Sequence, residues 1–286
     1  MPSHPLLENL SQLSRVDRAW GYDKNYLSAN YNTFFRFQVP TGYDSLYIKR
    51  YGELLKSGES GVLNRDIFRG DTDLPKMNSP YREKLVNLLG IKYFTYHLDS
   101  DIDDNLKGDE PRFADKLSKE YIPIRTDRWS IVQNPDVYPR AFLVSDYEIP
   151  NSDEDIIKKM FSNETDLRRK VFLEKQTNFT LDNVTGDALI ENYTPNSVKI
   201  KTNSQGNNLL FLSDNFYPGW NAYIDGVKGS VYRADYTFRA VYVPKGEHEV
   251  VFKYEPNSVK IGIVITILSL IGYAGWVVKY FAKVSR

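Results

Sequence analysis

The stretch that determines the fold of this chain is LLFLSDNFYPGWNAYIDGVKGSVYRADYTFRAVYVPKGEHEVVFKYEPNSVKIG, residues 209–262. Along it, and just before it, runs of β-branched and aromatic residues recur about every 8–12 residues between turn signals. Asp225-Gly226 is the strongest turn signal, because a type I′ hairpin needs a positive φ at both central positions. This spacing is typical of an antiparallel β-sandwich. The expected strands cover residues 188–192, 197–202, 208–214, 220–224, 230–234, 238–243 and 247–254.

An uncharged run of 18 residues, IGIVITILSLIGYAGWVV, follows at positions 261–278. As a helix it would measure about 27 Å, close to the thickness of the hydrocarbon core of a bilayer. Lys260 and Lys279 flank the run, and aromatic rings gather toward its C-terminal end, as is common at a membrane interface. A buried core helix, the alternative, would normally carry a polar stripe. We therefore predict one C-terminal transmembrane helix over residues 258–281.

The charges beyond this helix predict its orientation. The last residues of the chain include Lys279, Lys283 and Arg286 and no carboxylate. The positive-inside rule therefore predicts a cytoplasmic tail at residues 282–286, with residues 1–258 outside the cytoplasm. The first residues do not have the pattern of a secretory signal, so we expect the chain to be the C-terminal piece of a longer multi-pass protein. The alternative is a tail anchor whose soluble part stays in the cytosol.

The sequence before the sandwich indicates a small α/β domain over residues 15–135, preceded by a short segment at 1–14. Asn134-Pro135 is a turn signal and marks the boundary with the sandwich domain, residues 136–257. The elements expected in chain order are a helix over 45–56 with Asp44 or Ser45 as N-cap, a helix over 80–89 ended by Gly90, strands at 91–98, 121–125, 129–133 and 141–147, and a helix over 153–161 capped by Ser152. The predicted fold class is therefore α+β: a small α/β domain, then an antiparallel β-sandwich, then one transmembrane helix.

Composition and motifs exclude several classes of function. Lys plus Arg and Asp plus Glu each number 37, so no basic surplus exists to bind nucleic acid. Cysteine is absent, and the common hydrolase, nucleotide-binding and zinc-protease motifs are missing. The loop DSDIDDNLKGDE, residues 99–110, has the spacing of a calcium loop, but Asp104 stands where glycine is required. We expect a solvated acidic loop there, with calcium binding as the alternative, and we predict no cofactor and no metal.

Several longer motifs resemble those of one known family. In the sandwich they are Ser213-Asp214, Tyr217-Pro218-Gly219-Trp220, Asp225-Gly226, Arg239-Ala240-Val241, Gly246-Glu247-His248 and Tyr254-Glu255-Pro256. Upstream they are Gly42-Tyr43-Asp44-Ser45-Leu46, Arg50-Tyr51, Leu89-Gly90-Ile91-Lys92-Tyr93 and Pro139-Arg140-Ala141. With these motifs the chain resembles the C-terminal region of the YfhO family of bacterial multi-pass membrane proteins.

The resemblance implies a glycosyltransferase-like parent protein with a GT-C type membrane core. Such a protein uses lipid-linked sugars to decorate polymers of the bacterial cell envelope, for example in lipoteichoic acid glycosylation. Its catalytic carboxylates lie in an early extracytoplasmic loop between the first membrane helices, which these residues do not include. We therefore expect this chain to support acceptor or sugar binding in the cell membrane and to have no glycosyl-transfer activity alone. Its implied partners are the lipid bilayer, the N-terminal multi-pass core, and a polyprenyl-phosphate sugar or cell-wall glycan.

A sugar-binding platform is the candidate site. Pyranose rings pack on aromatic faces, and the aromatic residues of the 217–223 segment could supply one. The alternative is a Tyr/Trp pair that seals one end of the sandwich. The candidate substrate-binding residues are Tyr217, Trp220, Tyr223, Asp225, Arg239 and His248. No catalytic residue is predicted, and the second hypothesis for the chain is a non-enzymatic, membrane-anchored cell-surface module that binds glycans or a protein.

Overall fold

The computed structural model describes residues 4–21, 31–42, 47–67, 74, 79–97, 121–122, 129–184 and 186–284. Its helices are α1 (Pro5–Leu13), α2 (Tyr31–Phe35), α3 (Lys49–Ser57), α4 (Arg82–Leu88), α7 (Asp153–Met160) and α8 (Asn257–Val284). Its strands in the first half are β1 (Arg18–Gly21), β2 (Ile91–His97), β3 (Tyr121–Ile122), β4 (Trp129–Gln133), β5 (Ala141–Val144), β6 (Asp146–Glu148) and β7 (Lys170–Phe172). Those in the second half are β8 (Asp187–Thr194), β9 (Ser197–Ser204), β10 (Asn208–Asn215), β11 (Trp220–Ile224), β12 (Val227–Gly229), β13 (Val231–Ala234), β14 (Phe238–Val243) and β15 (Gly246–Tyr254).

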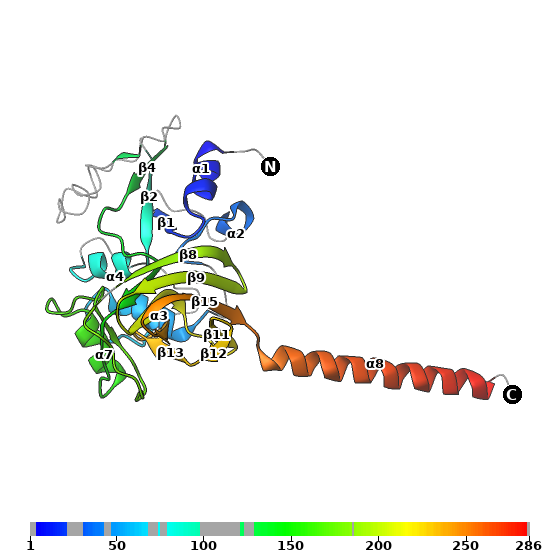
Figure 1. The fold of residues 1–286 in the computed structure, drawn as a ribbon. Coiled ribbons are helices and arrows are strands. Elements are labelled where there is room, and N and C mark those ends of the chain that lie inside the picture. Colours follow the sequence, from blue (N-terminus) through cyan, green and yellow to red (C-terminus); the bar gives the residue numbers. More distant parts are fainter. Residues whose placement is uncertain are drawn as a thin grey trace.

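The sandwich consists of two antiparallel sheets. One has the strand order β12-β11-β15-β9-β8, and its five strands are labelled in Figure 1. The other has the order β13-β14-β10-β5. Their facing side chains form one apolar cluster, with Leu210 and Val241 from the second sheet against Ile200 and Phe252 from the first. The α+β fold class and the antiparallel sandwich predicted from the strand spacing are confirmed.

Strand β10 is buried on both of its faces. Leu210 and Leu212 point into the sandwich, whereas Leu209 and Phe211 belong to a second cluster on the opposite side of the sheet. The run LLFL is therefore apolar throughout, where a half-exposed strand would alternate apolar and polar residues. The second cluster also takes in α3, α4 and α7, so β10 lies in the middle layer of three.

The N-terminal half adds a mixed sheet with the strand order β1-β2-β4-β3. Strand β1 pairs parallel to β2, and β4 pairs antiparallel to both β2 and β3. The second apolar cluster contains Leu54 and Phe94 from this half together with Ile157 and Phe211 from the other. One core thus crosses the predicted boundary at residues 135 and 136, and the division into two domains stays a prediction.

The local sequence signals predicted most helices and strands close to their observed positions, but they predicted the start of α3 poorly. Ser152 caps α7 by accepting a hydrogen bond from the Asp155 amide at 3.1 Å, as predicted. Helix α3, by contrast, begins at Lys49 with Ile48 as an N-cap that makes no side-chain bond. The expected caps Asp44 and Ser45 lie outside the described residues.

Tertiary packing explains why α3 begins later than predicted. The Tyr47 ring lies against the Gly52 backbone, where an added Cβ would meet ring carbon Cε2 at 2.7 Å. Ile48 packs against the second apolar cluster. We infer that burying these two side chains outweighs an earlier start of the helix, because helix propensity is a weak preference compared with core packing.

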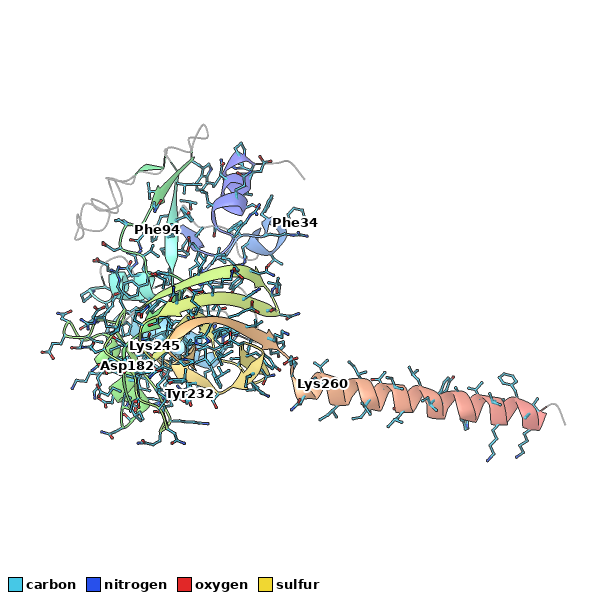
Figure 2. The ribbon with its side chains drawn as sticks, viewed as in Figure 1. Phe34, Phe94, Asp182, Tyr232, Lys245 and Lys260 are labelled. Carbon is cyan, nitrogen blue, oxygen red and sulfur yellow. The ribbon has the colours of Figure 1, made fainter. Side chains whose placement is uncertain are left out.

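Helix α8 projects from the sandwich as a single rod (Figure 1). It has a mean hydropathy of 2.2 over its most apolar window and is 0% buried, and its side chains extend on all sides beyond Lys260 (Figure 2). By length and composition it can cross a membrane. The apolar helix predicted over residues 258–281 is present and is slightly longer at both ends. The acidic loop at 99–110 and Arg286 lie outside the described residues.

Two glycines with positive φ hold tight turns. Gly226 has φ +81 and follows Asp225 at φ 48, which matches the predicted I′-type hairpin, and an added Cβ there would meet nothing within 4 Å. Gly90 has φ +66 between α4 and β2, and an added Cβ would lie 2.5 Å from Cδ of Arg140. Gly90 therefore serves both the backbone turn and the placement of that arginine.

We predict that Gly90→Ala destabilises the protein by about 2–4 kcal/mol, since left-handed strain and overpacking add together. Gly226→Ala is the matched control, because it introduces the left-handed backbone strain without a contact like the one with Arg140. It should lower the free energy of unfolding by about 1 kcal/mol. Urea unfolding of both variants measures the difference. Equal losses would show that the contact with Arg140 contributes nothing.

Candidate functional site: an arginine-rich cavity

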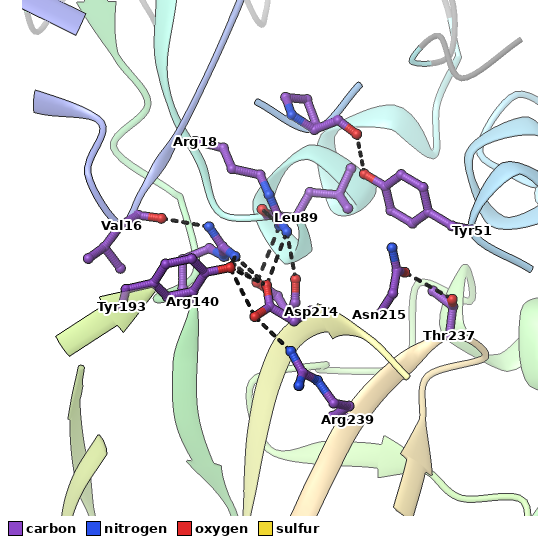
Figure 3. A network of polar contacts seen from close by, with 12 residues as sticks. Val16, Arg18, Tyr51, Leu89, Arg140, Tyr193, Asp214, Asn215, Thr237 and Arg239 are labelled. Carbon is purple, nitrogen blue, oxygen red and sulfur yellow. Dashed lines mark hydrogen bonds and ion pairs between the residues drawn. The ribbon is translucent and has the colours of Figure 1, made fainter. Parts of the chain in front are cut away.

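Asp214 lies at the end of β10, where the pairing with β14 shifts register between Leu212 and Asn215. Such a bulge leaves residues of one strand without partners and turns their side chains. Here it directs the Asp214 carboxylate toward the guanidinium groups of Arg18, Arg140 and Arg239 (Figure 3). A single buried carboxylate therefore joins three arginines.

The three arginines come from separate parts of the fold. Arg18 begins β1, Arg140 directly precedes β5, and Arg239 lies on β14. Nη2 of Arg239 lies 2.9 Å from Asp214 Oδ2, and Nη2 of Arg18 lies 3.4 Å from Oδ1, which Nη2 of Arg140 also contacts. Asp214 thus ties the N-terminal sheet to the sandwich.

Backbone carbonyls fix two of these arginines further. Arg18 donates to the carbonyl oxygens of Leu89 at 2.5 Å and Ser213 at 2.9 Å. Arg140 donates to the Val16 carbonyl oxygen at 2.6 Å. These hydrogen bonds fix the positions of both guanidinium groups independently of the Asp214 carboxylate.

The electrostatics of the cluster favour ionised Asp214. Burial alone would raise the pKa of its carboxyl group, but the charges of Arg140, Arg239 and Arg18 outweigh burial and lower the pKa to about 2. The Tyr193 hydroxyl also donates to the carboxylate, at 3.0 Å from Oδ2, and burial raises the pKa of that hydroxyl. At neutral pH three guanidiniums therefore surround one carboxylate.

Arg239 has the least complete set of partners. It is 1% exposed, and its Nε and Nη1 atoms have no hydrogen-bond acceptor among the described residues. Its guanidinium carbon lies 3.9 Å from the centre of the Trp220 ring and 5.3 Å from that of Phe252. These cation–π contacts offset only part of the cost of burying the charge.

A cavity of about 350 Å³ opens beside this cluster. The residues that the chemistry depends on are Arg18, Tyr193, Asp214, Tyr217, Trp220 and Arg239, and all of them line it. Trp220 is half-buried, and the centre of its ring lies 5.5 Å from that of the Tyr254 ring. Tyr217 is 49% exposed. The cavity therefore combines aromatic walls with an excess of positive charge, which suits an anionic or sugar-like ligand.

The structure brings together three of the six predicted site residues. Tyr217, Trp220 and Arg239 meet at the cavity. The other three do not line it: the Tyr223 hydroxyl donates to Glu255 Oε2 at 2.7 Å, and Asp225 pairs with His248. Whether any of the six binds substrate stays a prediction.

Asp225 and His248 form a separate pair at the β11–β12 hairpin. Nδ1 of His248 lies 2.6 Å from Asp225 Oδ2, and the Glu249 amide donates to Oδ1 at 2.9 Å. The bond with His248 is the main cause that lowers the pKa of Asp225. Both contacts join the hairpin to β15, and they account for this pair as turn structure.

Four residues of the site were not predicted from the sequence: Arg18, Arg140, Tyr193 and Asp214. Two signals were present: Arg140 and Asp214 lie inside motifs of the family resemblance, and Asp214 ends an otherwise apolar run. A charge at the end of a buried strand needs a partner. Nothing in the sequence indicated which residues would supply it, because Arg18 is nearly 200 positions away.

No group of metal-binding side chains occurs in the part of the chain that the structure describes. The loop with calcium-like spacing lies outside that part. Within the cavity, Asp214 is held ionised at neutral pH and is therefore poorly suited to exchange protons. The arrangement can bind and orient a ligand.

We predict that Asp214→Asn destabilises the folded chain by about 3–5 kcal/mol at neutral pH, because three buried guanidiniums lose their counter-charge. The folded-state pKa is lowered, so the stabilisation is present above about pH 4 and is lost as the pH falls toward 2. Urea unfolding should show the difference between wild type and variant narrowing in acid. Asp225→Asn, at an exposed pair, is the control and should cost far less; a similar cost would contradict the central role of Asp214.

One comparison with known proteins bears on identity. Residues 185–266 match the model of a family described as bacterial membrane protein YfhO. No curated protein and no solved structure matches the chain significantly. The matched span contains β8 to β15 and the beginning of α8, and with them Tyr193, Asp214, Trp220 and Arg239. The C-terminal region of this chain, from the edge of the sandwich into the apolar helix, is therefore similar to the YfhO family of bacterial membrane proteins.

Proposed function

We propose that this chain is the extracytoplasmic C-terminal part of a YfhO-type membrane protein that takes part in glycosyl transfer to cell-surface polymers. In this proposal the sandwich binds sugar or acceptor beside the membrane, and the chemistry is carried out by a multi-pass membrane core. The observation that carries the proposal is the short connection between the cavity and α8. Tyr254 lines the cavity, and α8 begins at Asn257.

The connection is also stiffened by direct contacts. The Glu255 amide donates to the Gly219 carbonyl oxygen at 2.7 Å, and a Cβ added at Gly219 would lie 3.0 Å from Cβ of Pro256. The turn that carries Tyr217 and Trp220 therefore packs on the residues that enter the helix. If α8 crosses the membrane, this end of the sandwich stays close to the membrane surface.

A binding role is favoured over a catalytic one by the state of Asp214. A general acid or base works best with a pKa near the operating pH, whereas this carboxyl group titrates at about 2. Its oxygens are also engaged by the arginines and by Tyr193. We therefore assign ligand binding, and no proton transfer, to the cavity.

The orientation is the first test, and we predict that the sandwich lies outside the cytoplasm with the end of α8 inside. The chain has no cysteine, so Val227→Cys and Val284→Cys, both at exposed positions, provide sites without background. A membrane-impermeant maleimide applied to intact cells should label only Cys introduced at Val227. Labelling of both after permeabilisation is the control, and labelling only at Val284, or protection of both in intact cells, would contradict this orientation.

The aromatic wall is the second test, and we predict that Trp220→Ala abolishes glycan binding by the full chain. The loss of stability should be about 1–3 kcal/mol, because a half-buried ring and its cation–π contact with Arg239 are removed. Tyr223→Ala removes an aromatic residue of the same strand outside the cavity and should leave binding intact. An immobilised glycan panel and thermal unfolding give the two readouts, and equal binding by wild type and Trp220→Ala would contradict the platform.

A further inference from the structure

The ion cluster beside the cavity has an excess of positive charge that the described residues do not neutralise, and two of its arginines, Arg18 and Arg239, line the cavity. Arg18, Arg140 and Arg239 face a single carboxylate, that of Asp214. Buried charges are normally paired, because an uncompensated charge in a water-poor site is costly. The site therefore lacks about two negative charges.

Arg239 shows where the missing charge would bind. Its side chain is 2% exposed and lines the cavity, yet only its Nη2 atom has an acceptor, Asp214 Oδ2. Nε and Nη1 are buried N–H donors without one. Trp220 lies over the guanidinium, and its half-buried ring forms part of the cavity wall that a ligand would displace.

The position of the cavity limits where the ligand comes from. From Tyr254 to Asn257 the chain advances three residues, which span at most about 10 Å. The exposed ring of Tyr217 and the partly exposed ring of Trp220 lie at the same end, and such rings favour the interface between lipid and water. A ligand carried by the membrane surface is therefore within reach.

We infer that the cavity binds the phosphomonoester headgroup of a membrane lipid, with Arg239 and Arg18 as its cationic contacts. A phosphomonoester carries a charge of about −1.5 to −2 at neutral pH, which matches the excess of the cluster. Its several oxygens can accept from more than one guanidinium, which a carboxylate does less well. This inference rests on the proposed function, because it takes α8 to be in the membrane. The bound lipid would hold the sandwich against the membrane beside α8.

The test is calorimetric titration of the full chain in detergent micelles with a short-chain phosphatidic acid. We expect saturable binding, and none with the phosphatidylcholine of the same chain length. Soluble glycerol phosphate has the same headgroup chemistry but does not concentrate in the micelle around α8, so it should bind at least about tenfold more weakly. Equal affinity for glycerol phosphate would overturn the lipid source, and no saturable binding of either would overturn the inference.

Three variants locate the binding. Arg239→Lys keeps the positive charge beside Asp214 but loses donor groups, and should weaken phosphatidic acid binding about tenfold. Asn196→Asp adds a negative charge at an exposed position on the cavity rim, where folding is not at risk, and should also weaken it. Lys260→Gln is the matched control, since it removes one exposed positive charge next to the membrane and outside the cavity.

A loss with Lys260→Gln as large as with Arg239→Lys would show nonspecific attraction to an anionic surface and would overturn the cavity as the site. Unchanged binding of phosphatidic acid by Asn196→Asp would also overturn the cavity as the site, and this test holds even if Arg239→Lys fails to fold. The proposed function fails on a different observation, the cysteine labelling pattern, so the two outcomes can be told apart.

Discussion

The ion cluster around Asp214 is the interaction on which the arrangement of the fold depends. It joins β1, the residue before β5, the end of β10 and β14 through one carboxylate. Buried ion clusters contribute less net stability than their number of contacts suggests, because desolvation offsets most of the attraction. Their main effect is to destabilise other packings of the strands, because a misplaced strand would leave a buried guanidinium group unpaired. We infer that this cluster selects one docking of the N-terminal sheet on the sandwich.

The sandwich could be predicted in detail, whereas the site could be predicted only in part. Strand positions follow from local patterns, such as the alternation in β15 and the Asp225-Gly226 turn, and these patterns are contained within a few residues. The partners of Asp214 are not local, because Arg18 and Arg140 lie far away in sequence. Arg18 reaches it from the N-terminal sheet, and Arg140 reaches it through the pairing of β5 with β10. The aromatic members of the cavity, Tyr217 and Trp220, were predicted because they stand together in one turn.

The residues of the site come from two parts of the chain, one inside the span that matches the family model and one before it. Asp214, Trp220 and Arg239 lie inside the matched span, whereas Arg18 and Arg140 lie before it. Within the matched sandwich alone, one carboxylate, that of Asp214, would face one guanidinium group, that of Arg239. The two arginines from the preceding sequence create the positive excess, so the net charge of the cluster depends on the N-terminal half.

The contact between the 217–220 turn and the entry to α8 links the cavity to the apolar helix. The Gly219 carbonyl accepts from the Glu255 amide, and Trp220 packs on Tyr254 while it covers Arg239. A tilt of α8 would therefore move Pro256 against Gly219 and shift the indole over the guanidinium. Conversely, a ligand that displaces the indole would press on the start of the helix. The 217–220 turn and residues 254 to 256 therefore border both the cavity and the start of α8.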